Sequence, residues 1–405
     1  MKLDINPRAK RSIAVITTSR ADYSHLYWPL KDLAAHPDID LKLIVLAAHL
    51  SPEYGDTISE IEHDGFPIAS RIECLLSSDS DVGMAKTLGL AVLGLADALS
   101  QIKPDLILLI ADRYEMLAPA SVALTLRIPV AHIEGGEISE GAIDDAVRNA
   151  LTKMSHLHFT STNTARARVI SMGEEPWRVH RAGAPSLDHL RRSTLLTRDQ
   201  LQQSLALPLA TDITVVAYHP VTLLKDTTAE ADAVFTALEA SLHTAPETQI
   251  IFCYPNADAG SHHLMARIRT FCDAHPNAHL FINLPSITYW SLLREATLLL
   301  GNSSSGIMEA ASFALPVVNI GIRQQGRERG PNILDADPTL DSIRTQIARA
   351  HDPAFRASLR NMQNIYGDGH AAERIVARIV EVLTTTPLDN LLHKRAQPIS
   401  PELLR

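Results

Sequence analysis

Residues 128–148 read I-P-V-A-H-I-E-G-G-E-I-S-E-G-A-I-D-D-A-V-R, and the predicted fold follows from them. The stretch opens as a short buried strand over residues 129–133, breaks at two glycines, and takes up a helical pattern near Gly141. Glu134 therefore stands just past the carboxyl end of a strand, and Asp144 falls in or near the first turn of the helix. Ligands of open α/β sheets bind outside the carboxyl ends of the strands, so a binding site is predicted here.

The preceding segment repeats this geometry one strand earlier. Residues 104–110 form a continuous apolar run that is followed by Asp112 and Arg113, and residues 115–127 read as a helix. A strand–helix–strand unit of this length favours parallel neighbouring strands joined by a right-handed crossover. Asp112 and Glu134 are then expected at adjacent strand ends, facing one crevice.

Three carboxylates, Asp112, Glu134 and Asp144, thus converge with Arg113. Clustered carboxylates raise one another's pKa, which is how acids and bases for proton transfer arise, so the spacing predicts a proton-transfer site. The alternative is structural: Asp112 would cap a helix, and Asp144 would complement a helix amino end. Capping does not account for Glu134, which precedes two glycines. Because Asp145 is adjacent to Asp144, either of the two residues could supply the third carboxylate.

Composition limits the classes of protein and partner. The chain has 405 residues, 46% of them hydrophobic, which suffices for two cores and favours two or three domains. Lys and Arg total 37 against 46 Asp and Glu, a net charge of −9, and no basic block occurs. Nucleic acid is therefore not an expected partner, and an anionic ligand would need a local positive site.

Cysteine usage and hydropathy indicate the compartment. Cys74, Cys253 and Cys272 lie far apart without a C-x-x-C motif, so neither a metal site nor a disulfide framework is expected. Residues 13–18 are too short for the core of a signal peptide, and no run reads as long enough to span a membrane. The expectation is a cytoplasmic protein without a membrane partner.

The order of strands and helices divides the chain into two α/β halves. The first covers residues 1–185, a stretch rich in small residues at 183–186 marks the boundary, and the second covers residues 186–370. The two halves are expected to leave a cleft between them. A helix over residues 371–385 is predicted to cross back onto the first half, and residues 386–405 are predicted to be an exposed tail.

Two strand–helix junctions carry residues suited to an anion. A Ser/Thr-rich turn with Arg20 and Ser24 follows the first strand, where helix amides and the arginine could hold an anion; an ordinary N-cap is the alternative. It is not G-x-G-x-x-G, so a dinucleotide fingerprint is absent. Residues 301–306, G-N-S-S-S-G, offer hydroxyls and helix amides as a diphosphate cradle, with a simple capped turn as the alternative.

Three further residues of the second half face the expected cleft. Glu309, one turn into the helix after the serine-rich loop, could accept both hydroxyls of a ribose, or instead offset the helix dipole. Arg323 follows residues 316–320, the last clear strand, and could face a phosphate or a base. His219 ends a strand before a proline, and a pKa near neutrality would let it donate a proton or bind a phosphate.

Taken together, these motifs resemble the hydrolysing UDP-N-acetylglucosamine 2-epimerases of bacterial sialic-acid pathways, and they are similar to the epimerase half of the bifunctional animal enzyme. Jointly the motifs are specific, and the resemblance covers residues 11–382. The matching segments are T-S-R-A-D-Y-S at 18–24, L-S-P-E-Y-G at 50–55, A-D-R-Y-E at 111–115, H-I-E-G-G-E at 132–137, I-D-D at 143–145, H-P-V-T at 219–222, G-N-S-S-S-G at 301–306 and G-I-R-Q at 321–324.

The resemblance implies two Rossmann-like doubly wound domains facing a cleft, as in GT-B glycosyltransferases, and chemistry that needs neither a nicotinamide cofactor nor a metal. It implies that a base removes the C2 proton of UDP-N-acetylglucosamine, UDP leaves C1, and water adds to the glycal intermediate. The products would be UDP and N-acetylmannosamine, which feeds sialic-acid-type sugars. It also implies a homodimer or homotetramer, for which an apolar helix such as residues 84–100 could serve as an interface or as core.

By position, the resemblance assigns catalysis and UDP binding to separate sets of residues. The catalytic set is Asp112, Glu134, Asp144 and His219, the last beside the leaving diphosphate, without a division of base and acid roles. The UDP-binding set is Arg20, Ser24, Arg113, Asn256, Ser303, Ser304, Glu309 and Arg323. The chain departs from the family at Ala111, where glycine is usual.

Other functions share these features. Legionaminic-acid-pathway relatives act on UDP-2,4-diacetamido-2,4,6-trideoxyglucose, which differs at C4 and C6, and no residue decides between the two sugars. A non-hydrolysing epimerase would return UDP-N-acetylmannosamine, but the versions of the motifs around Glu134 and Asp144 favour the hydrolysing branch. A GT-B glycosyltransferase would need an acceptor and not three carboxylates, and a catalytically silent nucleotide-sugar sensor would not need to retain them.

Overall fold

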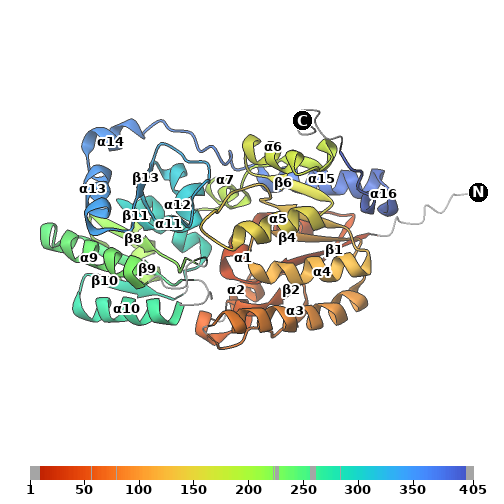
Figure 1. Ribbon diagram of the computed structural model, residues 1–405, viewed down its shortest axis with the longest axis horizontal. Coiled ribbons are helices and arrows are strands. Elements are labelled where there is room, and N and C mark those ends of the chain that lie inside the picture. Colours follow the sequence, from red (N-terminus) through yellow and green to blue (C-terminus); the bar gives the residue numbers. More distant parts are fainter. Residues whose placement is uncertain are drawn as a thin grey trace, which may run out of the picture.

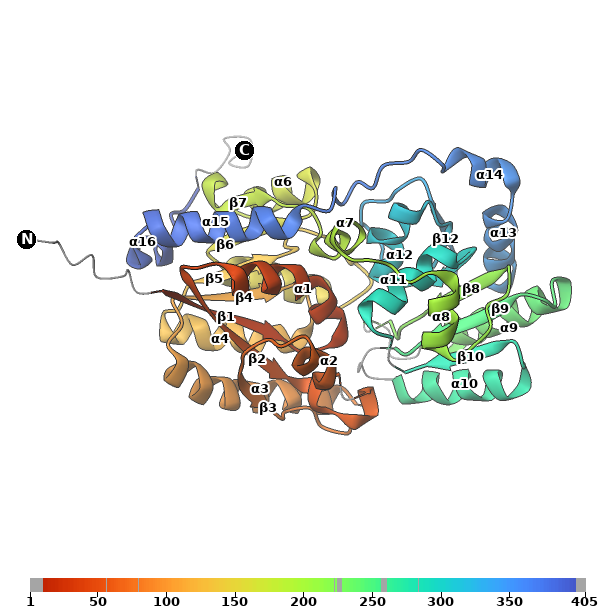
Figure 2. The ribbon, with the colours of Figure 1, turned by 180° about the vertical axis from the view of Figure 1, so that it is seen from behind.

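The structure, a computed structural model, describes residues 10–55, 57–78, 80–221, 223, 228–255, 261–282 and 284–397. The chain forms two lobes, each built on one parallel sheet with helices on both faces (Figure 1). The reverse view shows the chain crossing between the lobes beside α7 (Asp188–Arg192) and again on the way to α15 (Ala371–Thr385) (Figure 2).

The first sheet has seven strands in the order β3-β2-β1-β4-β5-β6-β7, and every neighbouring pair is parallel. The strands are β1 (Arg11–Thr17), β2 (Ile39–Leu46), β3 (Ile68–Ile72), β4 (Leu106–Ile110), β5 (Val130–Ile133), β6 (Leu157–Thr160) and β7 (Val179–Arg181). All five residues of β4, L-I-L-L-I, are buried, which is typical of a parallel strand covered on both faces.

The second sheet has six parallel strands in the order β10-β9-β8-β11-β12-β13. They are β8 (Ile213–Ala217), β9 (Gln249–Cys253), β10 (Ala278–Phe281), β11 (Leu298–Gly301), β12 (Val317–Ile320) and β13 (Ile333–Ala336). Separate apolar clusters cover its two faces, one around Phe252 and Leu300 and the other around Ile251 and Leu299. Successive residues of one strand thus pack into the cores on opposite faces of the sheet.

Counted from its own first strand, each sheet begins with the order 3-2-1-4-5-6, which is the doubly wound Rossmann order. The predicted α/β class with two Rossmann-like domains, arranged as in GT-B enzymes, is therefore confirmed. The strand order reverses between β1 and β4 and again between β8 and β11. Each reversal opens a crevice at the carboxyl ends of the strands, which is where such sheets bind ligands.

Helices connect the strands in sequence. Those of the first lobe are α1 (Arg20–Ala35), α2 (Ile58–His63), α3 (Asp81–Ile102), α4 (Leu117–Leu126), α5 (Asp144–Met154) and α6 (Asn163–Ser171). After α7 come α8 (Arg198–Leu205), α9 (Thr228–Thr244), α10 (Ser261–Ala274), α11 (Ser286–Glu295), α12 (Ser304–Met308), α13 (Leu340–Ala350) and α14 (Pro353–Ser358). The chain ends with α15 and α16 (Leu388–Leu392).

The prediction that the last strand ends near residue 320 was wrong, because β13 follows it. β13 pairs in parallel with β12 at the edge of the second sheet. Its sequence, I-L-D-A, is only four residues long and carries the exposed Asp335. So short a strand with a charge at its centre gives no clear alternation of apolar and polar residues.

The helix α15 returns to the first lobe. Its apolar face, including Ile375, Ile379 and Val382, belongs to the core of the first sheet and lies against α1. The carboxylate of Asp188 in α7 accepts hydrogen bonds from the first two backbone amides of α15, both at 2.9 Å. A side chain from the crossover between the lobes thus caps this helix.

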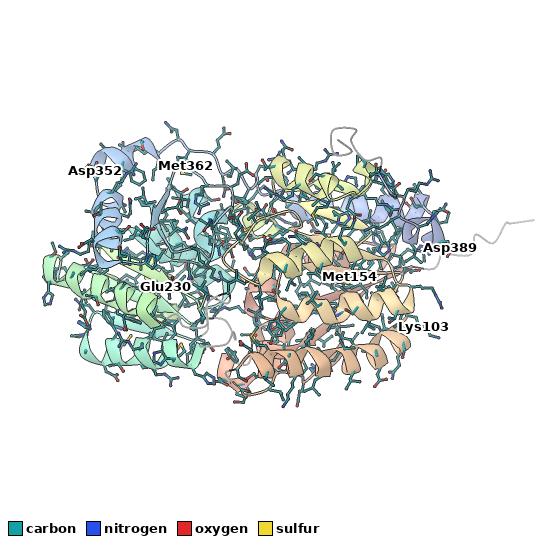
Figure 3. The ribbon with its side chains drawn as sticks, in the orientation of Figure 1. Lys103, Met154, Glu230, Asp352, Met362 and Asp389 are labelled. Carbon is teal, nitrogen blue, oxygen red and sulfur yellow. The ribbon has the colours of Figure 1, made fainter. Side chains whose placement is uncertain are left out.

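The prediction of an exposed tail from residue 386 onward was wrong for the part that the structure describes. Leu391 in α16 is fully buried in the first core. The Arg178 guanidinium donates to the carbonyl oxygens of Leu391 and His393 at 2.8 and 3.0 Å, and the Lys394 ammonium lies 2.7 Å from the Glu174 carboxylate. Figure 3 shows Asp389 at the outer end of the first lobe, opposite Asp352 of the second. Residues 398–405 lie outside the described residues.

One helix contradicts the expectation that no run is long enough to span a membrane. By length and composition α3 could cross one: it has 22 residues, and its most apolar 18-residue window has a mean hydropathy of 1.5. Only 28% of that window is buried. The buried positions recur every fourth residue through Thr87, Ala91, Leu95 and Leu99, and the last three belong to the first core. One face of α3 is therefore part of the first lobe, and the other is uncovered.

Candidate active site

One pocket lies between the lobes, at the carboxyl ends of strands from both sheets, and encloses about 1250 Å³ of space, its open mouth included. Eleven of the twelve residues predicted for the site line it: Arg20, Ser24, Asp112, Arg113, Glu134, Asp144, His219, Ser303, Ser304, Glu309 and Arg323. The twelfth, Asn256, lies outside the described residues. The separate predictions of a carboxylate site and of an anion site therefore fall in one cavity.

The lobes approach each other closely beside this pocket. The backbone amide of Glu140 donates to the carbonyl oxygen of Gln325 at 3.0 Å. A Cβ atom on Gly141 would lie 2.1 Å from the carbonyl oxygen of Ile322. Glycine at position 141 therefore lets the loop before α5 reach the loop that carries Arg323.

Two strand ends turn through left-handed backbone. The φ angle is 58° at Ala111, after β4, and 67° at Glu134, after β5. For L-residues other than glycine this conformation costs about 1–2 kcal/mol, and it persists where the surrounding structure holds it, often at functional sites. The positive φ at Ala111 accounts for the glycine that is usual at this position in the family that the sequence resembles.

Asp112 is held by Arg148, a residue that the sequence analysis did not single out. The guanidinium donates to the Asp112 carboxylate, to the Ser139 hydroxyl at 2.9 Å and to the Glu137 carbonyl oxygen at 2.9 Å. Burial raises the pKa of Asp112, but Arg148, Arg327 and Arg323 outweigh it and hold this pKa below its usual range. The expectation that neighbouring carboxylates raise it was wrong, because arginines surround the group.

Asp144 and Asp145 have different surroundings. Asp144 lines the pocket. Asp145 instead accepts hydrogen bonds from the backbone amide of Ser139 at 2.9 Å and from the Asn149 side chain at 3.1 Å. Of the two, Asp144 is the one placed to meet a ligand, and Asp145 holds the loop before α5.

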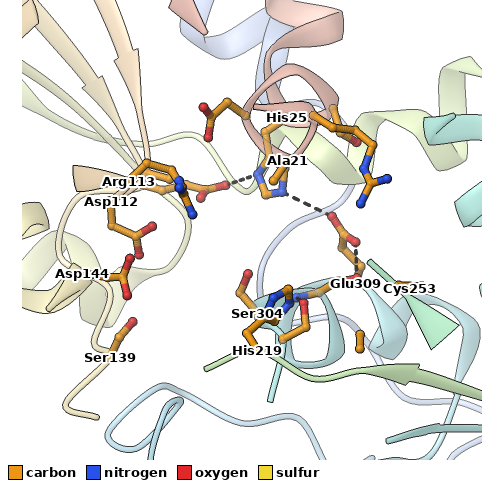
Figure 4. Close-up of a pocket in the computed structure, with 18 of the residues that line it drawn as sticks. Ala21, His25, Asp112, Arg113, Ser139, Asp144, His219, Cys253, Ser304 and Glu309 are labelled. Carbon is orange, nitrogen blue, oxygen red and sulfur yellow. Dashed lines mark hydrogen bonds and ion pairs between the residues drawn. The ribbon is translucent and has the colours of Figure 1, made fainter. Parts of the chain in front are cut away.

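A histidine lies between Glu134 and Glu309. His25 Nδ1 is 2.8 Å from Glu134, and its Nε2 is 3.4 Å from Glu309 (Figure 4). Burial lowers the pKa of His25, but the two carboxylates outweigh it and hold this pKa well above its usual range. His25 was not among the predicted site residues, although it stands one helical turn after Ala21, another residue that lines the pocket.

His219 is tied to the serine-rich loop through Asn302. The backbone amide of His219 donates to the Asn302 side chain at 2.8 Å, and that side chain donates back to the His219 carbonyl oxygen at 2.9 Å. Burial lowers the pKa of His219 well below its usual range, assisted by Arg323, Arg113 and Arg20. The expectation of a pKa near neutrality was therefore wrong, and the imidazole is neutral at pH 7.

Glu309 does not stand one turn into its helix, because α12 begins at Ser304 and ends before it. It therefore does not lie at the amino end of α12, where it would offset the dipole of that helix; it directly precedes the short 3-10 helix Ala310–Phe313. Its carboxylate accepts a hydrogen bond from the Ser305 hydroxyl at 2.5 Å. Burial raises the pKa of Glu309, but His25 and Ser305 outweigh it and lower this pKa. Glu309 is therefore an ionised acceptor on the wall of the pocket.

Side chains from both lobes line the pocket. Asp112 and Asp144 lie on one side, and His219 and Ser304 lie on the other (Figure 4). Arg323, on the side of the second lobe, donates to the carbonyl oxygen of Asn302 at 3.1 Å. Among the described residues, no three His, Cys, Asp or Glu side chains are grouped to hold a metal ion. The pocket thus offers arginines and hydroxyls that can hold an anion and carboxylates that can exchange protons.

The fold and the site together define a two-domain enzyme of GT-B type with a pocket between its Rossmann domains. The UDP-N-acetylglucosamine 2-epimerase family model matches residues 31–380. The chain belongs to this family, and it is a hydrolysing UDP-sugar 2-epimerase.

Individual relatives match nearly the whole chain. A "UDP-N,N'-diacetylbacillosamine 2-epimerase (hydrolyzing)" of Legionella pneumophila is 38% identical over 381 residues, 93% of this chain and 97% of the relative. A UDP-N-acetylglucosamine 2-epimerase of Neisseria meningitidis is 32% identical and covers 84% of this chain and 87% of its own. A UDP-GlcNAc 2-epimerase structure from Neisseria meningitidis, solved with UDP-GlcNAc, has a TM-score of 0.77 at 16% identity, covering 91% of this chain and all of that one, which shows the shared fold.

Proposed function

We propose that the substrate is UDP-2,4-diacetamido-2,4,6-trideoxyglucose, which is UDP-N,N'-diacetylbacillosamine. The observation that carries a UDP-sugar reaction is the pocket between the lobes, in which Asp112, Glu134 and Asp144 lie together with Arg20, Arg113 and Arg323. The choice of sugar is supported by the Legionella relative, which is more similar to this chain than the Neisseria one and matches 97% of its own length. The products are UDP and 2,4-diacetamido-2,4,6-trideoxymannose.

The chemistry divides between the two sides of the pocket. A carboxylate of the first lobe (Asp112, Glu134 or Asp144) takes the proton from C2. The C1–O bond breaks as the C1–C2 double bond forms, and UDP leaves with the bonding electrons. Water then adds its hydroxyl to C1, and a proton returns to C2 from the opposite face. A C2 proton is weakly acidic, so this step requires a positioned base.

Arginines and serines from both lobes stabilise the leaving group. Arg20, Arg113 and Arg323 bring positive charge to the pocket, and Ser303 and Ser304 stand at the start of α12. Donors fixed in place before the reaction stabilise the charge that develops on a departing diphosphate. His219 is neutral in the free enzyme and donates a hydrogen bond to the diphosphate, whose charge then raises the pKa of the imidazole.

A second sugar is supported by a specific observation. The Neisseria relative, which is named for UDP-N-acetylglucosamine, is 32% identical to this chain, and the sequence motifs resemble the same branch. UDP-N-acetylglucosamine carries hydroxyls at C4 and C6, where the diacetamido sugar has an acetamido group and a methyl. The test is kcat/KM for both sugars on one enzyme preparation. We expect the diacetamido sugar to be preferred at least tenfold, and the reverse preference would assign the enzyme to UDP-N-acetylglucosamine.

We further propose that the enzyme is a homodimer formed through α3. Its uncovered face presents Leu90 and Leu93, which are 41% and 68% exposed, between the exposed Lys86 and Asp97. If two copies of α3 pack antiparallel about a twofold axis midway between Leu90 and Leu93, each Leu90 meets Leu93 of the second copy. The same register places each Lys86 opposite Asp97 of the second copy, so the face is complementary to itself.

We also propose that the enzyme is located in the cytoplasm.

A further inference from the structure

His25 is a charged link between the two lobes. It stands on α1 of the first lobe, contacts Glu134 at the end of β5, and reaches Glu309 at the end of α12 in the second lobe. The side chains of Glu134 and Glu309 are only 4% and 5% exposed, and that of His25 is 17% exposed. Two nearly buried carboxylates therefore share one imidazolium, which each needs as a counterion.

The two contacts of His25 differ in length. The 2.8 Å distance from Nδ1 to Glu134 is that of a short charged hydrogen bond, whereas the 3.4 Å distance from Nε2 to Glu309 is long. Glu309 also accepts a 2.5 Å hydrogen bond from Ser305, on its other oxygen. A further donor that arrives at Glu309 would therefore displace the weaker of the two His25 contacts.

Under the proposed function that donor is a ribose hydroxyl of UDP. We infer that His25 is a positioning residue that couples ribose binding at Glu309 to the placement of Glu134. When the ribose binds Glu309, the His25 imidazolium contacts Glu134 only. The His25–Glu134 ion pair, on the side of the reacting sugar, then becomes tighter. The free enzyme uses the same residue to hold its two lobes at the pocket.

The other ionisable groups near His25 do not substitute for it. Asp22, on the same helix, is engaged by the backbone amides of Thr18 and Ser19 at 3.0 and 3.1 Å. His189 in α7 contacts the carbonyl oxygen of Ser24 at 3.0 Å, and burial lowers its pKa to about 4, so it is neutral. Glu134 and Glu309 are thus the charges that respond to the loss of His25.

Steady-state kinetics of His25→Gln and His25→Lys test the inference on whichever UDP-sugar the wild type turns over. Glutamine keeps a hydrogen-bond donor and removes the charge. We expect kcat to fall about 10- to 100-fold with KM changed less than about threefold, because Glu134 loses the 2.8 Å contact that positions it on the side of the reacting sugar. His25→Lys restores the charge and should recover part of the lost kcat.

The matched control is His36→Gln, at the opposite end of α1, which should behave as wild type. A His25→Gln enzyme with kcat within threefold of wild type would overturn the inference. So would a lowered kcat of which His25→Lys recovers nothing, since the inferred role requires a positive charge at position 25.

A binding measurement separates this inference from the proposed reaction. In protein labelled with ¹³C in the histidine rings, the signal missing from His25→Gln identifies His25. UDP should shift that signal, and 2′-deoxy-UDP should shift it much less, because it lacks one of the two hydroxyls offered to Glu309. Equal shifts with both nucleotides would overturn the coupling even if the enzyme is active. Failure of UDP to bind at all would instead count against the proposed function.

Discussion

At the scale of single residues, the neighbouring pair Asp144 and Asp145 makes a controlled comparison. Asp144 lines the pocket, whereas Asp145 is satisfied by Ser139 and Asn149. We expect Asp144→Asn to lower kcat about 100-fold or more, as for loss of a proton-transfer group. Asp145→Asn should stay within about tenfold and instead lose about 1 kcal/mol of unfolding free energy, the value of a hydrogen bond. The opposite ranking of kcat would move the third carboxylate to Asp145.

At Ala111, by contrast, the backbone conformation predicts that a substitution stabilises the protein. Its φ of 58° lies in the left-handed region, where glycine has no steric penalty. Ala111→Gly should therefore raise the free energy of unfolding by up to about 1 kcal/mol, measured by urea denaturation, with kcat unchanged within about twofold. A clear loss of stability would show that the alanine methyl contributes packing that outweighs the backbone strain.

At the scale of elements, buried histidines on β5 and α7 and in the turn before β6 contribute to the acid stability. Burial lowers the pKa of His132, His156 and His189 to about 4 each. The unfolded chain takes up these protons below a pKa of about 6.5 and the folded chain does not, so stability is present above pH 6.5 and is lost as pH falls toward 4. His25, whose pKa is raised, acts in the opposite sense at higher pH.

Urea denaturation at pH 7.0 and 5.5 tests this. Each of the three histidines should cost about 1 kcal/mol of unfolding free energy over that interval. His156→Gln removes one titrating group, and its amide oxygen can still accept from the backbone amide of Val130, as His156 does at 3.1 Å. The variant should therefore show a smaller loss than wild type. Equal losses of unfolding free energy in wild type and His156→Gln would mean that other groups dominate the loss of stability at low pH.

The elements also show how far the sequence predicts this molecule. The strand ends at Asp112, Glu134 and His219 were predictable, because continuous apolar runs followed by polar residues mark buried parallel strands and their carboxyl ends. Arg148 and His25 were not predicted, since each acts through a partner more than thirty residues away in the chain. The lowered pKa values of Asp112 and His219 depend on arginines that only the fold brings near.

At the scale of the whole molecule, the uncovered face of α3 predicts the oligomeric state. Wild type should be a dimer by size-exclusion chromatography with light scattering, and Leu93→Arg should be a monomer, because it buries a charge in the proposed apolar contact. Lys86→Glu should weaken the dimer, and the double variant Lys86→Glu/Asp97→Lys should restore it by exchanging the paired charges. A wild-type monomer, or a double variant no better than the single one, would contradict this register.

The central claim is that one pocket removes the C2 proton and expels UDP. It is tested most directly by incubating the enzyme in D₂O with the diacetamido sugar nucleotide, and separately with UDP-N-acetylglucosamine, while proton NMR follows the sugar and UDP release is measured. We expect a free manno-configured sugar that carries deuterium at C2, with one UDP released per sugar. Release of UDP with hydrogen retained at C2, or a sugar that stays attached to UDP, would contradict elimination and rehydration in this pocket.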